Sequence, residues 1–368
     1  MKQLLKYLLC ALCAAMFMGV SAFAQITTSA LGGKVVDKAG EPVIGAAVVA
    51  THEPSGTVYG VVTNEDGRYV INGMRSGGPY KVEISCLGYQ TVINTDITLQ
   101  LGEPYALNSA LNDDSEMLSE AMVVAQAASR FAGEKTGAAT NISSKQMDAL
   151  PNISRSLEDV SKLSPYGGNG MNFAGGDGRS SNFTVDGANF NNNFGLNEGL
   201  PGGGNPISID AIEEMQVVIA PYDVRQTNFI GGGMNAITKS GTNQFKGSAY
   251  TYHKNEWMRG NTNYLGEEFG NRNKERMTTY GFTLGGPIIK NKLFFFVNFE
   301  RSQSPTEVNL WRASVDGVAD ADHYISRTTE ADMEAVKKHL MDNYGYDAGS
   351  YTDYPAQETN TKVLARID

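Results

Sequence analysis

The sequence has little cysteine, little proline and no excess of positive charge. Its 30 Lys and Arg residues are outnumbered by 40 Asp and Glu residues, and only 3 cysteines and 12 prolines occur among 368 residues. A nucleic-acid-binding surface needs a clustered basic excess, so we predict no nucleic-acid partner. Glycine reaches 41 residues and aromatic side chains 9%, whereas only 19% of residues are charged. This composition favours β-structure with many turns over a helical bundle, a coiled coil or a disordered tail.

Long apolar runs are confined to the start of the chain. Lysines at positions 2 and 6 precede such a run, and an Ala-Phe-Ala triplet ending at Ala24 supplies the small residues that a signal peptidase reads. We interpret residues 1–24 as a signal peptide, cleaved between Ala24 and Gln25. A membrane anchor is the alternative, but the polar residues after Ala24 favour cleavage. Because no later apolar run has spanning length, any later membrane crossing must use a β-barrel.

The sequence has few candidate catalytic or metal-binding residues. After cleavage Cys86 is the only cysteine left, so no internal disulfide can form, and its apolar surroundings predict a buried filler. The four histidines are far apart in sequence, no His-Glu-x-x-His motif occurs, and we predict surface positions for them. The Asp and Glu residues are too dispersed in sequence for us to identify a catalytic acid/base pair of carboxylates. We therefore predict no catalytic, metal-binding or cofactor-binding residues and no cofactor.

Between about residues 31 and 111 the sequence alternates short apolar runs with turn clusters. Seven short strands at such spacing predict an all-β sandwich. One cluster, Asn64 to Gly67, contains acidic residues that suggest a calcium loop. It lacks the later ligands of an EF-hand, and Asp-Gly between strands is the usual hairpin turn, so we predict a turn.

Four phrases in this segment carry a family resemblance. They are GKVVD at 33–37, GEPVIGA at 40–46, TNEDGRY at 63–69 and GY at 88–89. In this order they resemble the carboxypeptidase regulatory-like domain, a transthyretin-like sandwich that precedes many outer-membrane receptors of Bacteroidetes-type bacteria. The resemblance implies such a domain at 25–112 and no protease activity.

Residues 113–128 are expected to be a linker that holds a short β-prone stretch. By pattern alone this stretch is an eighth sandwich strand. By position it resembles a TonB box, the exposed strand that the periplasmic protein TonB captures. An extended segment with free backbone groups can join a partner's sheet. The candidate TonB contacts are Leu118, Ser119, Glu120, Ala121, Met122, Val123, Val124 and Ala125.

Glycine and asparagine dominate the next segment, with 12 and 9 of the residues at 161–206. Both tolerate left-handed backbone and suit irregular loops, and neither phosphate-loop glycine motif occurs. VDG at 185–187, IDAIEEMQVV at 209–218 and GGGMNAITKSGTN at 231–243 resemble the plug of TonB-dependent receptors. We expect an α/β plug at 129–240. Residues 220–229 depart from the usual pattern and resemble the Oar-like branch rather than the SusC-like glycan importers.

The last third, 241–368, reads as the start of an outer-membrane barrel. Strands are expected at 245–254, 277–288, 293–300 and 362–368, with connections that alternate long, short and long. That alternation is typical of external loops and periplasmic turns. Plugged barrels use about 22 strands, so four cannot close one. We therefore expect an N-terminal part of a longer receptor.

The expected fold is thus mainly β: a transthyretin-like sandwich, an α/β plug, then the first strands of a transmembrane barrel. The resemblance implies transport across the outer membrane energised by TonB, with outer-membrane lipid around the barrel and the N-terminal domain in the periplasm. It leaves the substrate open between a carbohydrate and a peptide. The alternatives are a surface adhesin or secretion pore on the same scaffold, or a secreted carbohydrate-binding module.

Overall fold

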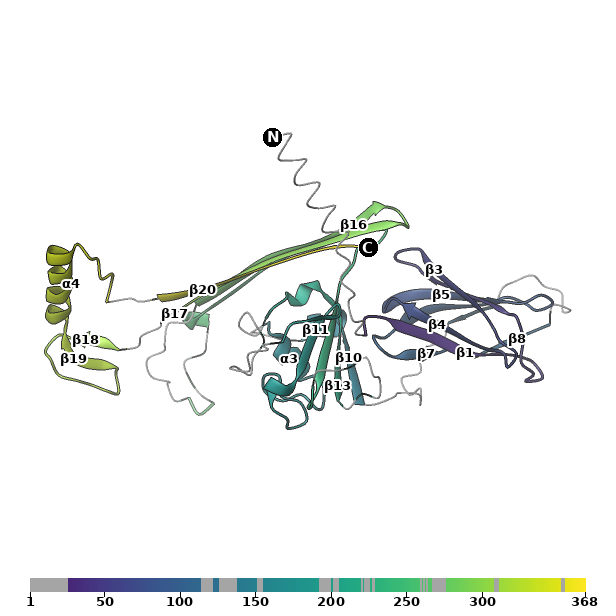
Figure 1. The fold of residues 1–368 in the computed structure, drawn as a ribbon, viewed down its shortest axis with the longest axis horizontal. Helices are drawn as coiled ribbons and strands as arrows, with labels where there is room; N and C mark the ends of the chain where they lie inside the picture. Colours follow the sequence, from purple (N-terminus) through teal and green to yellow (C-terminus); the bar gives the residue numbers. More distant parts are fainter. Residues whose placement is uncertain are drawn as a thin grey trace, which may run out of the picture. The chain divides into compact units, whose positions relative to one another are not determined.

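The computed structural model of the chain describes most residues after residue 25 (Figure 1). The described residues are 26–113, 122–125, 138–150, 155–191, 200, 205–219, 221, 226, 229–258, 260, 262, 264–266, 276–307, 311–351 and 355–368. The predicted signal peptide, its cleavage site Ala24–Gln25 and four of the candidate TonB contacts, Leu118, Ser119, Glu120 and Ala121, lie outside them. The chain forms two compact units, of which the second comprises Ser248–Phe282 and Phe299–Val363.

The N-terminal domain is the predicted sandwich of two sheets. One sheet has the order β4-β1-β7, and β8 also pairs with β1; the other has the order β3-β2-β5-β6-β9. Alternate residues point inward, so side chains of both sheets fill a shared core that includes Leu31, Val48 and Tyr80. The strands are β1 Ser29–Asp37, β2 Ala47–His52, β3 Thr57–Val62, β4 Arg68–Met74, β5 Gly77–Ser85, β6 Val92–Leu99, β7 Pro104–Ala106, β8 Ser109–Leu111 and β9 Met122–Ala125.

The sandwich tests three local predictions: the turn at Asn64–Gly67, the burial of Cys86 and the surface position of the histidines. The Asn64 side chain accepts hydrogen bonds from the backbone of Asp66 and Arg68, and Gly67 has φ +71°, so this segment is the predicted turn. Cys86 is free and half-buried against the core rather than fully buried. The surface prediction is wrong for His52, which is buried because it continues the inward-facing row of β2. Its ring Nδ1 lies 2.6 Å from the Ser55 hydroxyl.

The central domain, residues 138–238, is built on one mixed sheet of order β10-β13-β14-β11-β12. Its only parallel pair in the described part is β11 with β14. The two middle strands β13 and β14 are almost entirely buried, because short helices and irregular segments cover the sheet. The elements are β10 Ala138–Ser143, α2 Ser144–Ala149, α3 Leu157–Ser161, η1 Gly178–Ser180, β11 Asn182–Val185, β12 Ala188–Asn189, η2 Ile209–Ala211, β13 Ile212–Ile219 and β14 Gly233–Thr238.

The C-terminal strands form a sheet of order β15-β16-β17-β20, and Figure 1 shows these long strands in green to yellow. Strands β16 and β17 are longer than predicted, at 14 and 15 residues. The hydrogen-bonded ladder continues past the end of the apolar run, where the sequence pattern stops indicating a strand. The strands are β15 Lys246–Asn255, β16 Arg276–Ile289, β17 Leu293–Glu307 and β20 Pro355–Ile367.

The connection between β17 and β20 holds further structure. It contains β18 Arg312–Ser314, β19 Ile325–Thr329 and α4 Glu330–Tyr344, and η3 Glu256–Met258 follows β15. Helix α4 lies on the surface: it has no buried residue, a capping box between Thr329 and Asp332, and a left-handed Gly345 at its end. In the described part of the chain no helix is long and apolar enough to cross a membrane.

Candidate functional site

The candidate coupling strand lies at the edge of a sandwich sheet. Residues Met122–Ala125 form β9, which pairs in parallel with β6; Ile93 is the register partner of Val123, and Asn94 that of Val124. The other pairs of this sheet, β2 with β3, β2 with β5 and β5 with β6, are antiparallel. The segment is thus an added sandwich strand, as its pattern alone predicts. The pairing does not test whether this segment contacts TonB, so that role stays a prediction.

The backbone N–H and C=O of Leu101, in the sandwich, are held by three side chains of the central domain. The Leu101 N–H donates to both carboxyl oxygens of Glu214, at 3.0 and 3.1 Å. The Leu101 carbonyl accepts from Asn141 Nδ2 at 3.0 Å and from Gln216 Nε2 at 2.6 Å. Because β10 and β13 are neighbours in the sheet, Asn141 also reaches Glu214, at 3.1 Å.

Glu214 is a buried acid. Only 7% of the residue is exposed, and burial raises the pKa of its carboxyl to about 7, although the Leu101 N–H bond opposes the rise. Ile26, Leu101 and Ile237 form a small buried cluster. Glu214 was not among the residues predicted from the sequence. The sequence feature that could have indicated it is a glutamate within the strand-like run IEEMQVVI at 212–219.

A second polar cluster fixes the VDG motif of the central domain. Asp186 has φ 49°, and its carboxylate accepts from the Thr238 backbone N–H at 2.9 Å and from the Thr238 hydroxyl at 2.6 Å. Arg366 of β20 donates to the Thr238 carbonyl at 2.9 Å and lies 3.5 Å from Asp186. The motif therefore has a structural function, which is to hold the turn after β11 against β14 and Arg366.

A buried ion pair lies on the C-terminal sheet. Lys362 Nζ is 2.8 Å from Glu300 Oε1, with side-chain exposures of 8% and 5%. Tyr250 donates its hydroxyl to the other Glu300 oxygen at 2.9 Å. These residues come from β20, β17 and β15, so the bonds join three of the four strands. No sequence pattern indicated this pairing, because Glu300 and Lys362 are 62 residues apart.

The two faces of β16 differ in polarity. Tyr280, Phe282 and Leu284 are exposed by 40 to 44%, whereas the residues between them are Gly281 and Thr283. In β17 the buried row begins with Phe294 and Phe296 and ends with the polar Asn298 and Glu300, and the alternating Val297 and Phe299 are half-buried. An exposed row of apolar side chains that alternates with small or polar residues, as on β16, is typical of strands that face lipid.

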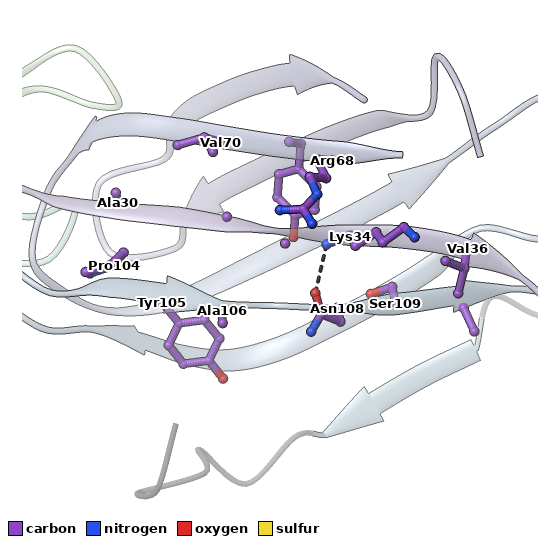
Figure 2. Close-up of a pocket in the computed structure, with 14 residues that line it drawn as sticks. Ala30, Lys34, Val36, Arg68, Val70, Pro104, Tyr105, Ala106, Asn108 and Ser109 are labelled. Carbon is purple, nitrogen blue, oxygen red and sulfur yellow. Dashed lines mark hydrogen bonds between the residues drawn. The ribbon is translucent and has the colours of Figure 1, made fainter. Parts of the chain in front are cut away.

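A groove of about 710 Å³ lies on one sheet of the sandwich (Figure 2). Its lining includes Lys34, Arg68, Tyr105 and Asn108. Asn108 accepts a hydrogen bond from the Lys34 backbone N–H at 2.8 Å, which joins β1 to the segment between β7 and β8. Lys34 and Arg68 are register partners on β1 and β4, and within the described chain neither has an ion-pair partner. The described residues also hold no cluster of metal-ligating side chains.

Two protein-family models match the chain. A carboxypeptidase regulatory-like domain matches residues 30–112, and an outer membrane beta barrel domain matches residues 237–323. The TonB-dependent transporter Oar of Myxococcus xanthus is 25% identical over 351 residues, which is 90% of this chain and 32% of that protein. The TonB-dependent receptor SusC of Bacteroides thetaiotaomicron is 27% identical over 251 residues, 63% of this chain and 23% of that protein. The chain thus spans about a third or less of these curated relatives.

Among solved structures, the siderophore receptor PirA of Pseudomonas aeruginosa is similar with a TM-score of 0.35 at 17% identity, over 46% of this chain and 28% of that one. The family matches confirm the predicted carboxypeptidase regulatory-like domain, the mainly β fold class and the relation to TonB-dependent receptors. They place the chain at the outer membrane. Its relatives are named as transporters and receptors, not as enzymes.

Proposed function

We propose that this protein transports a substrate across the outer membrane, and that TonB supplies the energy through residues 118–125. The observation that carries the proposal is the alternation on β16, where Tyr280, Phe282 and Leu284 are exposed on one face and Gly281 and Thr283 lie between them. A sheet with an apolar outer face can sit in lipid while its other face lines a polar interior.

The central domain is proposed to be the plug inside that barrel. Phe296 of β17 belongs to the same buried cluster as Phe183 and Met234 of the central domain. Arg366 of β20 is bonded to Thr238 at the end of β14. Contacts of this kind would keep the domain seated against the barrel wall until a pull on its N-terminal side releases it.

That pull is proposed to act through Val123 and its neighbours. TonB would pair its own strand with this segment, because backbone hydrogen bonds give affinity in strand addition. The proposed substrate is either a carbohydrate or a peptide. A strain that lacks the receptor, compared with one that expresses it, should fail to deplete the substrate from a medium that contains both classes.

The coupling step is tested with Val123→Pro. Proline removes a backbone donor and fixes φ, so the purified periplasmic domain of TonB should bind the variant at least tenfold more weakly than the parent. Val123→Ile is the matched control, because it keeps the backbone donor and a β-branched side chain. Equal binding of TonB to the proline variant and to the parent would refute coupling through this segment.

A further inference from the structure

Two positive charges lie directly opposite each other in the groove of the sandwich. Lys34 of β1 and Arg68 of β4 are partners in an antiparallel register, and both side chains are exposed. Like charges in this position destabilise a sheet, because cross-strand neighbours lie close together. Within the described residues no acidic side chain forms an ion pair with either of them. A bound anion would remove this repulsion.

The charged and amide side chains of the groove all donate hydrogen bonds. Lysine and arginine side chains donate and cannot accept. Asn108 uses its Oδ1 to accept the Lys34 backbone N–H at 2.8 Å, so its amide NH2 group is the part that can serve a ligand. None of the 14 lining residues, all in the described part of the chain, is Asp or Glu. The groove therefore suits a ligand that supplies acceptor oxygens and negative charge.

The other end of the groove is apolar. Ala30 is the register partner of Pro104, and Gly32 is that of Val70. Figure 2 shows Ala30, Val70 and Pro104 grouped together, apart from the two cations. Ala30 precedes Lys34 by four residues of one strand, which places the apolar end about 13 Å from the cationic end.

We propose that this groove binds a short peptide segment that carries a carboxylate and an apolar side chain four residues apart. The carboxylate accepts hydrogen bonds from Lys34, Arg68 and Asn108, and the apolar side chain packs on Ala30 and Val70. The groove volume of about 710 Å³ fits such a ligand and is much larger than a bare anion needs. The site shares no residue with the proposed coupling segment or with the C-terminal strands, so the inference goes beyond the proposed transport.

The charge of the sandwich favours a peptide over an anionic lipid surface. Between residues 26 and 113 the sequence has 9 Asp and Glu residues against 5 Lys and Arg residues. A domain with this net negative charge is repelled by an extended surface of the same sign. A single carboxylate can enter the groove without bringing the rest of the domain against a charged surface.

The test is the binding of a fluorescent, end-blocked pentapeptide, with leucine first and glutamate last, to the full chain. The same peptide with glutamine in place of glutamate is the control ligand, because it keeps the shape and loses the charge. Lys34→Gln and Arg68→Gln each remove one cation at an exposed position. Lys38→Gln is the matched control variant, because Lys38 is also exposed but does not line the groove.

We expect the glutamine peptide to bind about tenfold more weakly than the glutamate peptide, since hydrogen bonds to a charged group are the stronger ones. Lys34→Gln and Arg68→Gln should each weaken binding of the glutamate peptide about tenfold, and Lys38→Gln should leave it unchanged. Equal binding of the two peptides, or no binding of either, would overturn recognition of a carboxylate. Unchanged affinity in both groove variants would overturn the location of the site. If glycerol phosphate, the soluble head of an anionic lipid, bound as tightly as the glutamate peptide, the choice of a peptide would be wrong.

Discussion

Replacing Glu214 by Gln should remove a pH dependence from the contact between the sandwich and the central domain. Glu214 is 7% exposed and accepts the Leu101 N–H at 3.0 and 3.1 Å, and burial raises the pKa of its carboxyl from 4.5 to about 7. When the contact opens, the carboxyl returns to water and to its ordinary pKa. The closed contact is therefore favoured by the protonated acid.

The size of the effect follows from the two pKa values. Because the pKa is raised in the closed state, stability is fully present below pH 4.5, is lost as pH rises towards 7, and levels off above it. A shift of about 2.5 units corresponds to about 3 kcal/mol in total. Between pH 5 and pH 8 the closed contact should lose about 2.5 kcal/mol.

The Glu214→Gln substitution keeps the size and an acceptor oxygen of the native side chain without the charge. The amide oxygen can still accept the Leu101 N–H, and no group that titrates in this pH range remains at position 214. The Glu214→Gln variant should thus match the parent near pH 4.5 and be more stable at pH 8.

Hydrogen exchange of the Leu101 amide reports the opening directly. In the parent protein the free energy of opening, corrected for intrinsic exchange, should fall by about 2.5 kcal/mol from pH 5 to pH 8. In Glu214→Gln it should stay level. A flat profile in the parent, or the same slope in the variant, would refute the assignment of the pH dependence to this carboxyl.

Two further predictions concern buried polar groups. Asn94→Val should stabilise the sandwich by about 1–3 kcal/mol, because it replaces a buried amide nitrogen that has no hydrogen-bond partner among the described residues. Thr95→Val, at a half-buried position, is the control, and a lower melting temperature for Asn94→Val contradicts the reasoning. Lys362→Met should destabilise the C-terminal sheet by about 3–5 kcal/mol, because it leaves the Glu300 carboxylate buried without a counter-charge. The double variant Lys362→Met with Glu300→Leu should be close to neutral. Heat-dependent gel mobility of the folded receptor measures this, and equal losses in both variants would contradict a stabilising pair.

Local sequence signals determined much of the fold. The turn at Asn64 follows from an Asx side chain followed by Asp-Gly, and helix α4 follows from the Thr329–Asp332 capping box and Gly345. Such features depend on residues within a few positions of one another, so short-range sterics and hydrogen bonding decide them. The sandwich strands were recognisable for the same reason, since alternation of apolar residues is a property of each strand alone.

Tertiary structure alone decided which distant groups meet. His52 reads as a surface histidine in the sequence, and only the position of β2 in the sandwich makes it buried, which lowers the pKa of its ring to about 4. Leu101 and Glu214 are 113 residues apart, and Glu300 and Lys362 are 62 apart. The pairing of β9 with β6 likewise depends on which sheet edge is free. Sheet order and packing set these contacts, and no local pattern encodes them, because each partner on its own is compatible with many neighbours.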